Sequence, residues 1–322
     1  MQLTPEQERL FRIFHPNAAK KHAIACSNGT RFVYYTRAET AFRILKNKQI
    51  WMRNAMCMND FMEVQYGLHR LYKAYHESEA GKRFKSFMDD LFDGFRTEIE
   101  KLFDSCTQHL RTDTYITCLS EHKAEEDTLG RLSMWRAYGG ATGVALVMKT
   151  APFEATEPSD VLKIYGSPVA YYDDKKFSAE FAEIVNNIDN ESDFIKQRDR
   201  NEIKERILRM LAYGAVCTKH PGFEEELEWR IIHFPWWEKS VHLIKEIEVI
   251  QGAPQTVFKI PLEDIPKEGL FGITIPALID RIIIGPNRDP LAMKLAFIDL
   301  LDKAGAEQPG KKVFVSDVPL RQ

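Results

Sequence analysis

Two glutamates separated by one residue are the first candidates for chemistry. Glu226 and Glu228 stand at the start of an apolar stretch that predicts a strand over residues 227–234. Because side chains alternate along a strand, Glu226, Glu228 and Arg230 would share one face. One carboxylate can raise the pKa of the other, and one can stabilise a developing positive charge. The simpler alternative is a solvent-facing strand on which Glu228 pairs with Arg230.

Hydroxyl groups end two further stretches that predict strands. Tyr34 and Thr36 lie on one face at the end of RFVYYT, where a pair of hydroxyls can hydrogen-bond a ribose. Thr36 can instead cap the helix that follows. Ser120 ends TYITCLS, where it either binds a ligand or caps the next turn.

Ser133, Trp135 and Tyr138 lie on a predicted helix over residues 128–138 that two glycines end. Trp135 and Tyr138 are three residues apart and so lie near one face. Aromatic residues at that spacing usually belong to the hydrophobic core. The alternative is a flat platform for a nicotinamide or base ring.

The composition argues against several classes of protein. The 44 basic and 47 acidic residues give a net charge of -3, whereas nucleic-acid binders usually show a basic excess. The five cysteines are scattered and contain no C-x-x-C pair, which indicates a reducing, cytoplasmic environment. Cys217 and His220 have the side chains of zinc ligands, but the sequence offers no second pair of ligands to match them, so we expect no metal site. We expect neither a signal peptide nor a membrane span.

The elements that must position these residues follow from local periodicity. Helices are predicted over residues 4–14, 38–47, 82–110, 128–138, 177–217 and 290–303, and Asn59 and Asp60, with Glu63, predict the start of another. Strands are predicted over 31–35, 49–52, 114–119, 143–148, 227–234, 243–249, 255–260, 281–284 and 312–315, with one or two more over 161–172.

This order of elements predicts the fold class. Strands near both ends of the chain bracket long helical stretches, unlike the regular alternation of a doubly wound sheet. We therefore expect an α+β protein, a single domain over residues 1–322 with a central mixed or split sheet and helical insertions at about 60–110 and 177–217. Glycine-rich nucleotide-binding loops such as G-x-G-x-x-G are missing from the sequence.

The order of the motifs is more specific than any one of them. YYT, ND-x-x-E, CLS, SMWRAYGG-x-x-G and K-x-x-x-F-x-x-E-x-EWR follow one another over roughly residues 31–232. This pattern resembles the bacterial family of domains of unknown function DUF2971. It also resembles the ADP-ribosyltransferase superfamily, whose first strand carries a His or Arg and a small hydroxyl residue. Tyr34 and Thr36 take that place here, and Ser120 with Ser133–Tyr138 takes the place of the second, Ser or Tyr motif.

The resemblance implies an NAD-dependent ADP-ribosyltransferase or NAD-cleaving enzyme, of a bacterial toxin or phage-defence type. NAD would be the substrate, and a protein or nucleic acid would be the acceptor. Glu228 takes the place of the catalytic glutamate, which would bind the ribose and stabilise an oxocarbenium-like transition state. Glu226 would orient or deprotonate the acceptor, Ser120 would position the ribose, and the nicotinamide would stack on Tyr138 or Trp135.

Two other functions stay open at this point. The first is a non-catalytic sensor or interaction module on the same fold, with the charged helical stretch at 177–217 as a surface for a protein partner. The second is a nuclease, which the charge balance and the lack of a carboxylate metal cluster disfavour.

Overall fold

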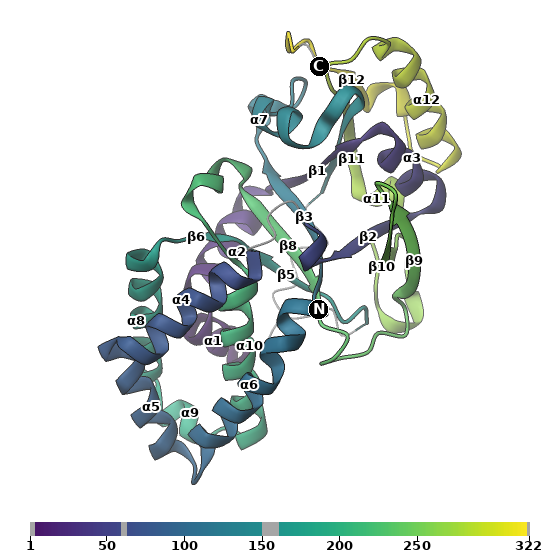
Figure 1. The fold of residues 1–322 in the computed structure, drawn as a ribbon. Helices are drawn as coiled ribbons and strands as arrows, with labels where there is room; N and C mark the ends of the chain where they lie inside the picture. Colours follow the sequence, from purple (N-terminus) through teal and green to yellow (C-terminus); the bar gives the residue numbers. More distant parts are fainter. Residues whose placement is uncertain (1–3, 59–62, 150–160, 321–322) are drawn as a thin grey trace.

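A computed structural model describes residues 4–58, 63–149 and 161–320. Its centre is a ten-stranded sheet that lies beside a separate group of helices (Figure 1). The ten strands are β1 (Arg31–Arg37), β2 (Gln49–Asn54), β3 (Tyr115–His122), β4 (Gly143–Met148), β5 (Tyr165–Pro168), β8 (Glu228–His233), β9 (Ile244–Ile250), β10 (Ala253–Pro261), β11 (Ile279–Ile284) and β12 (Val313–Val315). Two short strands, β6 (Ala170–Tyr171) and β7 (Thr218–Lys219), form a second sheet.

The sheet is mixed, because β11 and β12 pair in parallel while the other described neighbours pair antiparallel. Its path runs β12-β11-β4-β1-β3-β2-β10-β9, and β8 and β5 extend it from the other edge of β3. One edge of β3 is shared by two strands: β1 pairs with Ser120–His122 and β2 with Tyr115–Ile116. The two strands therefore diverge along β3. The α+β class with a central mixed sheet is confirmed.

The described helices are α1 (Pro5–Phe14), α2 (Pro16–Asn28), α3 (Ala38–Asn47), α4 (Glu63–Glu77), α5 (Glu79–Leu91), α6 (Phe95–Thr112), α7 (Leu132–Met134), α8 (Asp174–Asn190), α9 (Ser192–Lys196), α10 (Arg200–Val216), α11 (Ile275–Leu278) and α12 (Pro290–Lys303). No helix in the described ranges is both long and apolar enough to cross a membrane.

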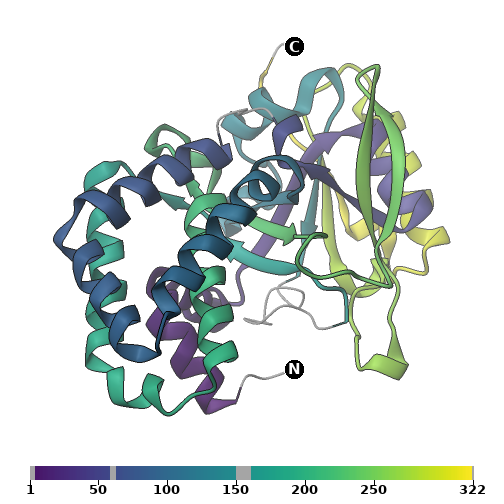
Figure 2. The ribbon, with the colours of Figure 1, turned by 60° about the horizontal axis from the view of Figure 1, so that its bottom comes forward.

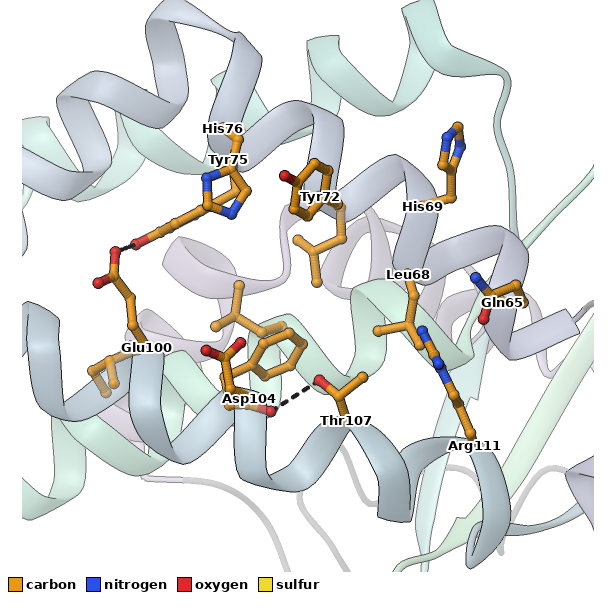
Figure 3. A pocket seen from close by; sticks show the side chains of 14 residues that line it. Gln65, Leu68, His69, Tyr72, Tyr75, His76, Glu100, Asp104, Thr107 and Arg111 are labelled. Carbon is orange, nitrogen blue, oxygen red and sulfur yellow. Dashed lines mark hydrogen bonds between the residues drawn. The ribbon is translucent and has the colours of Figure 1, made fainter.

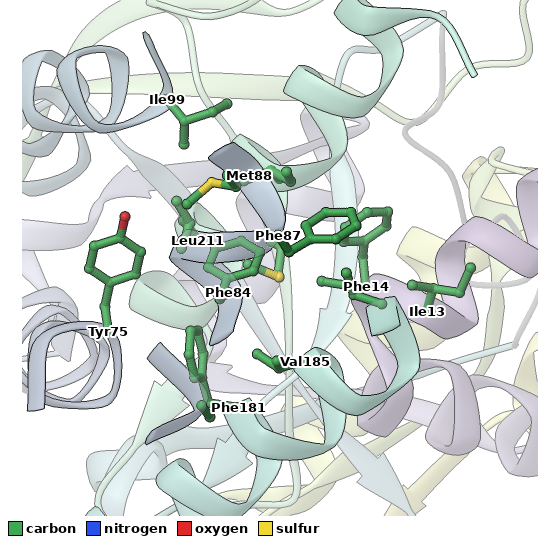
Figure 4. Close-up of a cluster of buried hydrophobic side chains, with 14 of the residues drawn as sticks. Ile13, Phe14, Tyr75, Phe84, Phe87, Met88, Ile99, Phe181, Val185 and Leu211 are labelled. Carbon is green, nitrogen blue, oxygen red and sulfur yellow. The ribbon is translucent and has the colours of Figure 1, made fainter. Parts of the chain in front are cut away.

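The stretches at about 60–110 and 177–217 form α4–α6 and α8–α10, which pack on one another and on α1 away from most of the sheet (Figures 1 and 2). A cavity lies between α4 and α6 (Figure 3). The core of this helical layer is rich in aromatic residues, with Phe14, Phe84 and Phe181 among its most buried members (Figure 4). Burial of so much apolar surface stabilises the layer independently of strand pairing.

Two more hydrophobic cores cover the two faces of the sheet around β1 and β4. Phe32, Leu146 and Trp229 pack with residues of α3 and α12 on one face. Val33 and Val147 pack with the Trp135 segment on the other face. The predicted strand over 143–148 is confirmed without change as β4, and its six residues are all buried, as expected for a strand covered on both faces.

Several predicted boundaries were wrong. The helix predicted over 82–110 is two helices, since Gly94, at φ 67°, separates α5 from α6. The helix predicted over 128–138 is one α-turn followed by a π-turn over Trp135–Gly139. Thr36 does not cap α3, because β1 continues to Arg37. The structure adds α2, which was not predicted, and the predicted cap at Asn59 and Asp60 lies outside the described residues.

Candidate functional site

The site is built on the register between β3 and β8. Ser120 lies directly opposite Glu228, and Val33 of β1 lies opposite Ser120 on the other side. Residues paired in this way point to the same face of a sheet. Ser120 and Glu228 therefore share a face, and both are only 4% exposed.

Glu228 is held by two cations. Its carboxylate lies 3.0 Å from Nζ of Lys219 and 2.7 Å from Nε of Arg230. Burial by itself raises the pKa of Glu228, but Arg230 and Lys219 outweigh burial and hold that pKa well below its ordinary value. The Cys118 thiol hydrogen-bonds to the carboxylate and acts in the same direction. Glu228 is therefore ionised at neutral pH and is no general acid.

Lys219 joins the two glutamates. It stands in β7, three residues after α10 ends, where the pairing of β7 with β6 holds the backbone. Its Nζ lies 2.7 Å from Glu226 and 3.0 Å from Glu228. It also lies 4.7 Å from the ring centre of Phe223, which is 38% exposed. Lys219 and Phe223 stand in the motif K-x-x-x-F-x-x-E-x-EWR, but sequence reasoning gave neither of them a role in the site.

Glu226 reaches this position differently from the prediction. It ends a 3-10 helix (Pro221–Glu226), and Leu227 follows at φ 44°, so β8 begins only at Glu228. The prediction that Glu226 and Glu228 lie on one strand was wrong. The left-handed backbone of Leu227 turns the chain between the 3-10 helix and β8. Glu226 and Glu228 are nevertheless linked, because both pair with Lys219. The Glu226 side chain is 15% exposed and is the more accessible carboxylate.

Tyr138 completes the group. Its hydroxyl donates a hydrogen bond of 2.9 Å to Glu226. Burial raises the pKa of Tyr138, and the negative charge of Glu226 raises it further, so the phenol stays a neutral donor. We call Lys219, Glu226, Glu228, Arg230 and Tyr138 the Lys219 cluster. Ser133 lies half-buried in α7, which packs on the 3-10 helix that carries Glu226.

Trp135 is a core residue and not a ligand platform. Its side chain is fully buried and packs edge-on against Tyr35 at 4.9 Å. A Cβ added at Gly143 or Gly285 would lie within about 3 Å of its ring, which shows how closely the backbone covers it. Its Nε1 donates to the carbonyl of Leu129. The alternative of a nicotinamide stacked on Trp135 is therefore contradicted.

Tyr34 and Thr36 are not brought to the face that carries Glu228. They alternate with Val33, so they point to the opposite face, where Tyr34 packs at the edge of the core around Phe32. Burial raises the pKa of Tyr34, and Cys118 on the neighbouring β3 contributes in the same direction. Tyr34 thus lies beside β3 where β1 and β2 diverge.

The chemistry open to the Lys219 cluster is charge stabilisation and hydrogen bonding. Glu228, which Arg230 and Lys219 keep ionised, can stabilise a positive charge that develops near it. Glu226 is the more exposed carboxylate and can hydrogen-bond a group that enters from solvent. No group of three or more His, Cys, Asp or Glu residues within the described ranges is arranged to hold a metal ion.

Comparison with known proteins gives one finding. No curated protein and no solved structure matches this chain. A family model does match, over a stretch that includes β4–β7, most of β8, α8–α10 and all five members of the Lys219 cluster but not Tyr34, Thr36, Ser120 or Ser133. The expected resemblance to DUF2971 is thereby confirmed for this part of the chain: residues 134–231 match the family described as "Protein of unknown function (DUF2971)".

Proposed function

We propose that this chain cleaves the bond between nicotinamide and ribose in NAD and transfers the ADP-ribose to an acceptor, at the Lys219 cluster. The observation that carries the proposal is the convergence of the second and third motifs. β3 and β8 are neighbours in the sheet, and Ser120 of the second motif lies directly opposite Glu228 of the third. More than one hundred residues separate Ser120 from Glu228 in the sequence.

The residues present fit NAD in part. Carboxylates and hydroxyls that can bind ribose hydroxyls come together in Glu226, Glu228 and Tyr138. The exposed ring of Phe223 beside Lys219 offers the flat apolar surface that Trp135 does not. Tyr34 and Thr36 have no direct part in the proposed NAD site, because they lie on the other face of the sheet.

Each carboxylate has a separate role in the proposed reaction. When the glycosidic bond breaks, the nicotinamide leaves with the bonding electron pair and positive charge develops on the ribose. Glu228, ionised and held in place by Arg230, stabilises that charge. The acceptor hydroxyl, or water, adds to the ribose carbon and gives its proton to Glu226, which is the more exposed carboxylate.

The test is nicotinamide release from NAD by the full chain, followed by chromatography, together with NAD binding by calorimetry. Glu226→Gln and Glu228→Gln should each slow release by about 10²-fold or more. Glu224→Gln is the matched control, since Glu224 is exposed in the same 3-10 helix. Intact NAD after long incubation with the protein and with cell lysate, combined with no binding of NAD, would contradict the proposal.

A second candidate function is a non-catalytic interaction module on the same fold. The complete pairing of Glu228 with Lys219 and Arg230, at 4% exposure, favours it, because such a carboxylate is already occupied. In that case a partner protein captured by the wild-type chain should still be retained by Glu228→Gln. Loss of the partner together with loss of NAD turnover would instead favour the enzyme.

A further inference from the structure

A cavity of about 450 Å³ lies between α4 and α6, outside the Lys219 cluster (Figure 3). Cavities of roughly 300–1,000 Å³ are typical of small-molecule sites. None of its lining residues belongs to the Lys219 cluster. It is therefore a separate candidate site.

The floor of the cavity is apolar and rigid. It consists of Leu68 and Leu71 from α4, Ile99 and Phe103 from α6, and Leu211 from α10. Leu71, Ile99 and Leu211 also belong to the buried core of the helical layer, which fixes their positions. Figure 4 shows Ile99 and Leu211 in that core. A ligand with an apolar body would cover this floor at little cost in ordering the protein.

The rim is polar and, at its centre, acidic. Glu100 and Asp104 are one turn apart on α6, so their carboxylates repel one another. Glu100 accepts a hydrogen bond of 2.6 Å from the Tyr75 hydroxyl. Asp104 is exposed and makes no ion pair with any residue that the structure describes. A ligand cation between the two carboxylates would relieve the repulsion.

An aromatic side chain faces the same part of the cavity. Tyr72 is 59% exposed, and its ring lies across the cavity from Asp104 (Figure 3). The neighbouring Tyr75 already carries a cation over its ring, since Nζ of Lys85 lies 4.5 Å from the ring centre. A carboxylate pair beside an exposed tyrosine is an arrangement that binds organic ammonium groups. The ring of His76, which also lines the cavity, lies 4.4 Å from the Tyr72 ring. Among the described residues that line the rim, Arg111 is the one formal cation, and it stands two turns from Asp104, about 10 Å along α6.

We propose that this cavity binds a small organic amine whose apolar body rests on the leucine and phenylalanine floor and whose ammonium group lies between Asp104, Glu100 and Tyr72. An anionic ligand of the same shape would meet two carboxylates and should bind most weakly. A neutral ligand would fill the floor but gain nothing from the rim. The charge of the ligand is therefore the property that the site selects.

The test uses three probes with one body: phenylbutylamine, phenylbutanol and phenylbutanoate, each titrated into the full chain at low salt and followed by calorimetry. The amine should bind at least about tenfold more tightly than the alcohol, and the carboxylate most weakly. Added salt should weaken binding of the amine and leave the alcohol unchanged.

Asp104→Asn is the decisive variant, because Asp104 is exposed and its replacement leaves the core intact. It should reduce the affinity for the amine about tenfold without changing that for the alcohol. Asp93→Asn, an exposed carboxylate just before α6 and outside the cavity, is the control and should change neither. Equal binding of the three probes, no binding of the amine, or an unchanged affinity in Asp104→Asn would overturn the proposal.

Discussion

The Glu228 carboxylate lies 3.0 Å from Nζ of Lys219, and each side chain is only 4% exposed. Lys219→Met removes the cation that Glu226 and Glu228 share and leaves the buried Glu228 carboxylate to Arg230. It should lower the free energy of unfolding by about 1–3 kcal/mol, measured by urea denaturation. Lys20→Met is the control, since Lys20 pairs with Glu183 at the surface, and should cost less than about 1 kcal/mol. Equal costs would show that the Lys219 pair adds no more than a surface pair.

The imidazole of His15 makes stability depend on pH. Burial, together with the charges of Arg206 and Arg209, lowers the pKa of His15 to about 3. Because the folded pKa lies below the unfolded value of about 6.5, the stabilising contribution is complete above pH 6.5 and is lost as the pH falls toward 3. By pH 5 the loss is at most about 2 kcal/mol. His15→Gln should lose less stability than the wild type between pH 7.5 and pH 5, in urea denaturation at both values. Parallel losses would contradict the assignment.

Gly67 is where α4 and α10 come into backbone contact. A Cβ at this position would lie 2.0 Å from the carbonyl oxygen of Ala215. Gly67→Ala should force the helices apart and cost about 1–3 kcal/mol. Gly214→Ala, on α10, is the matched control, because its Cβ would lie 3.8 Å from Phe177 and alanine favours the helix by about 0.5–1 kcal/mol. Thermal unfolding of the two variants should shift in opposite directions.

Substitutions at Trp135 and Tyr138 should have different effects, because Trp135 is a core residue and Tyr138 belongs to the proposed site. Trp135→Ala removes a fully buried ring and should cost about 3–5 kcal/mol of stability. Tyr138→Phe removes one hydrogen bond, to Glu226, and should cost about 0.5–1.5 kcal/mol. Under the proposed function, Tyr138→Phe should also weaken NAD binding while the chain stays folded. The milder variant Trp135→Phe, which keeps an aromatic ring in the core, should lower stability and leave NAD binding unchanged. Calorimetry with NAD and thermal unfolding of the same samples give both readings.

The elements that local chemistry specifies were predictable. Thr4 caps α1 with the reciprocal bonds of a capping box, and the helix predicted over 290–303 is α12. The strand over 143–148 was recognisable because six apolar residues leave it no solvent-facing side. The predicted helix over 128–138 was wrong because local spacing favoured a regular helix while packing imposed an α-turn and a π-turn. The turn around Trp135 is held by contacts with Tyr35 and Gly285, which are distant in the sequence.

The sequence by itself determined the α+β class, most strands and the set of motifs that carry Ser120, Tyr138, Glu226 and Glu228. Only the tertiary structure decided how these side chains are oriented. A strand register set by distant partners places Tyr34 on one face and Ser120 on the other, and a left-handed Leu227 takes Glu226 off the strand. Lys219 became visible as the centre of the cluster only in three dimensions, because an ion pair depends on the distance between atoms and not on spacing along the chain.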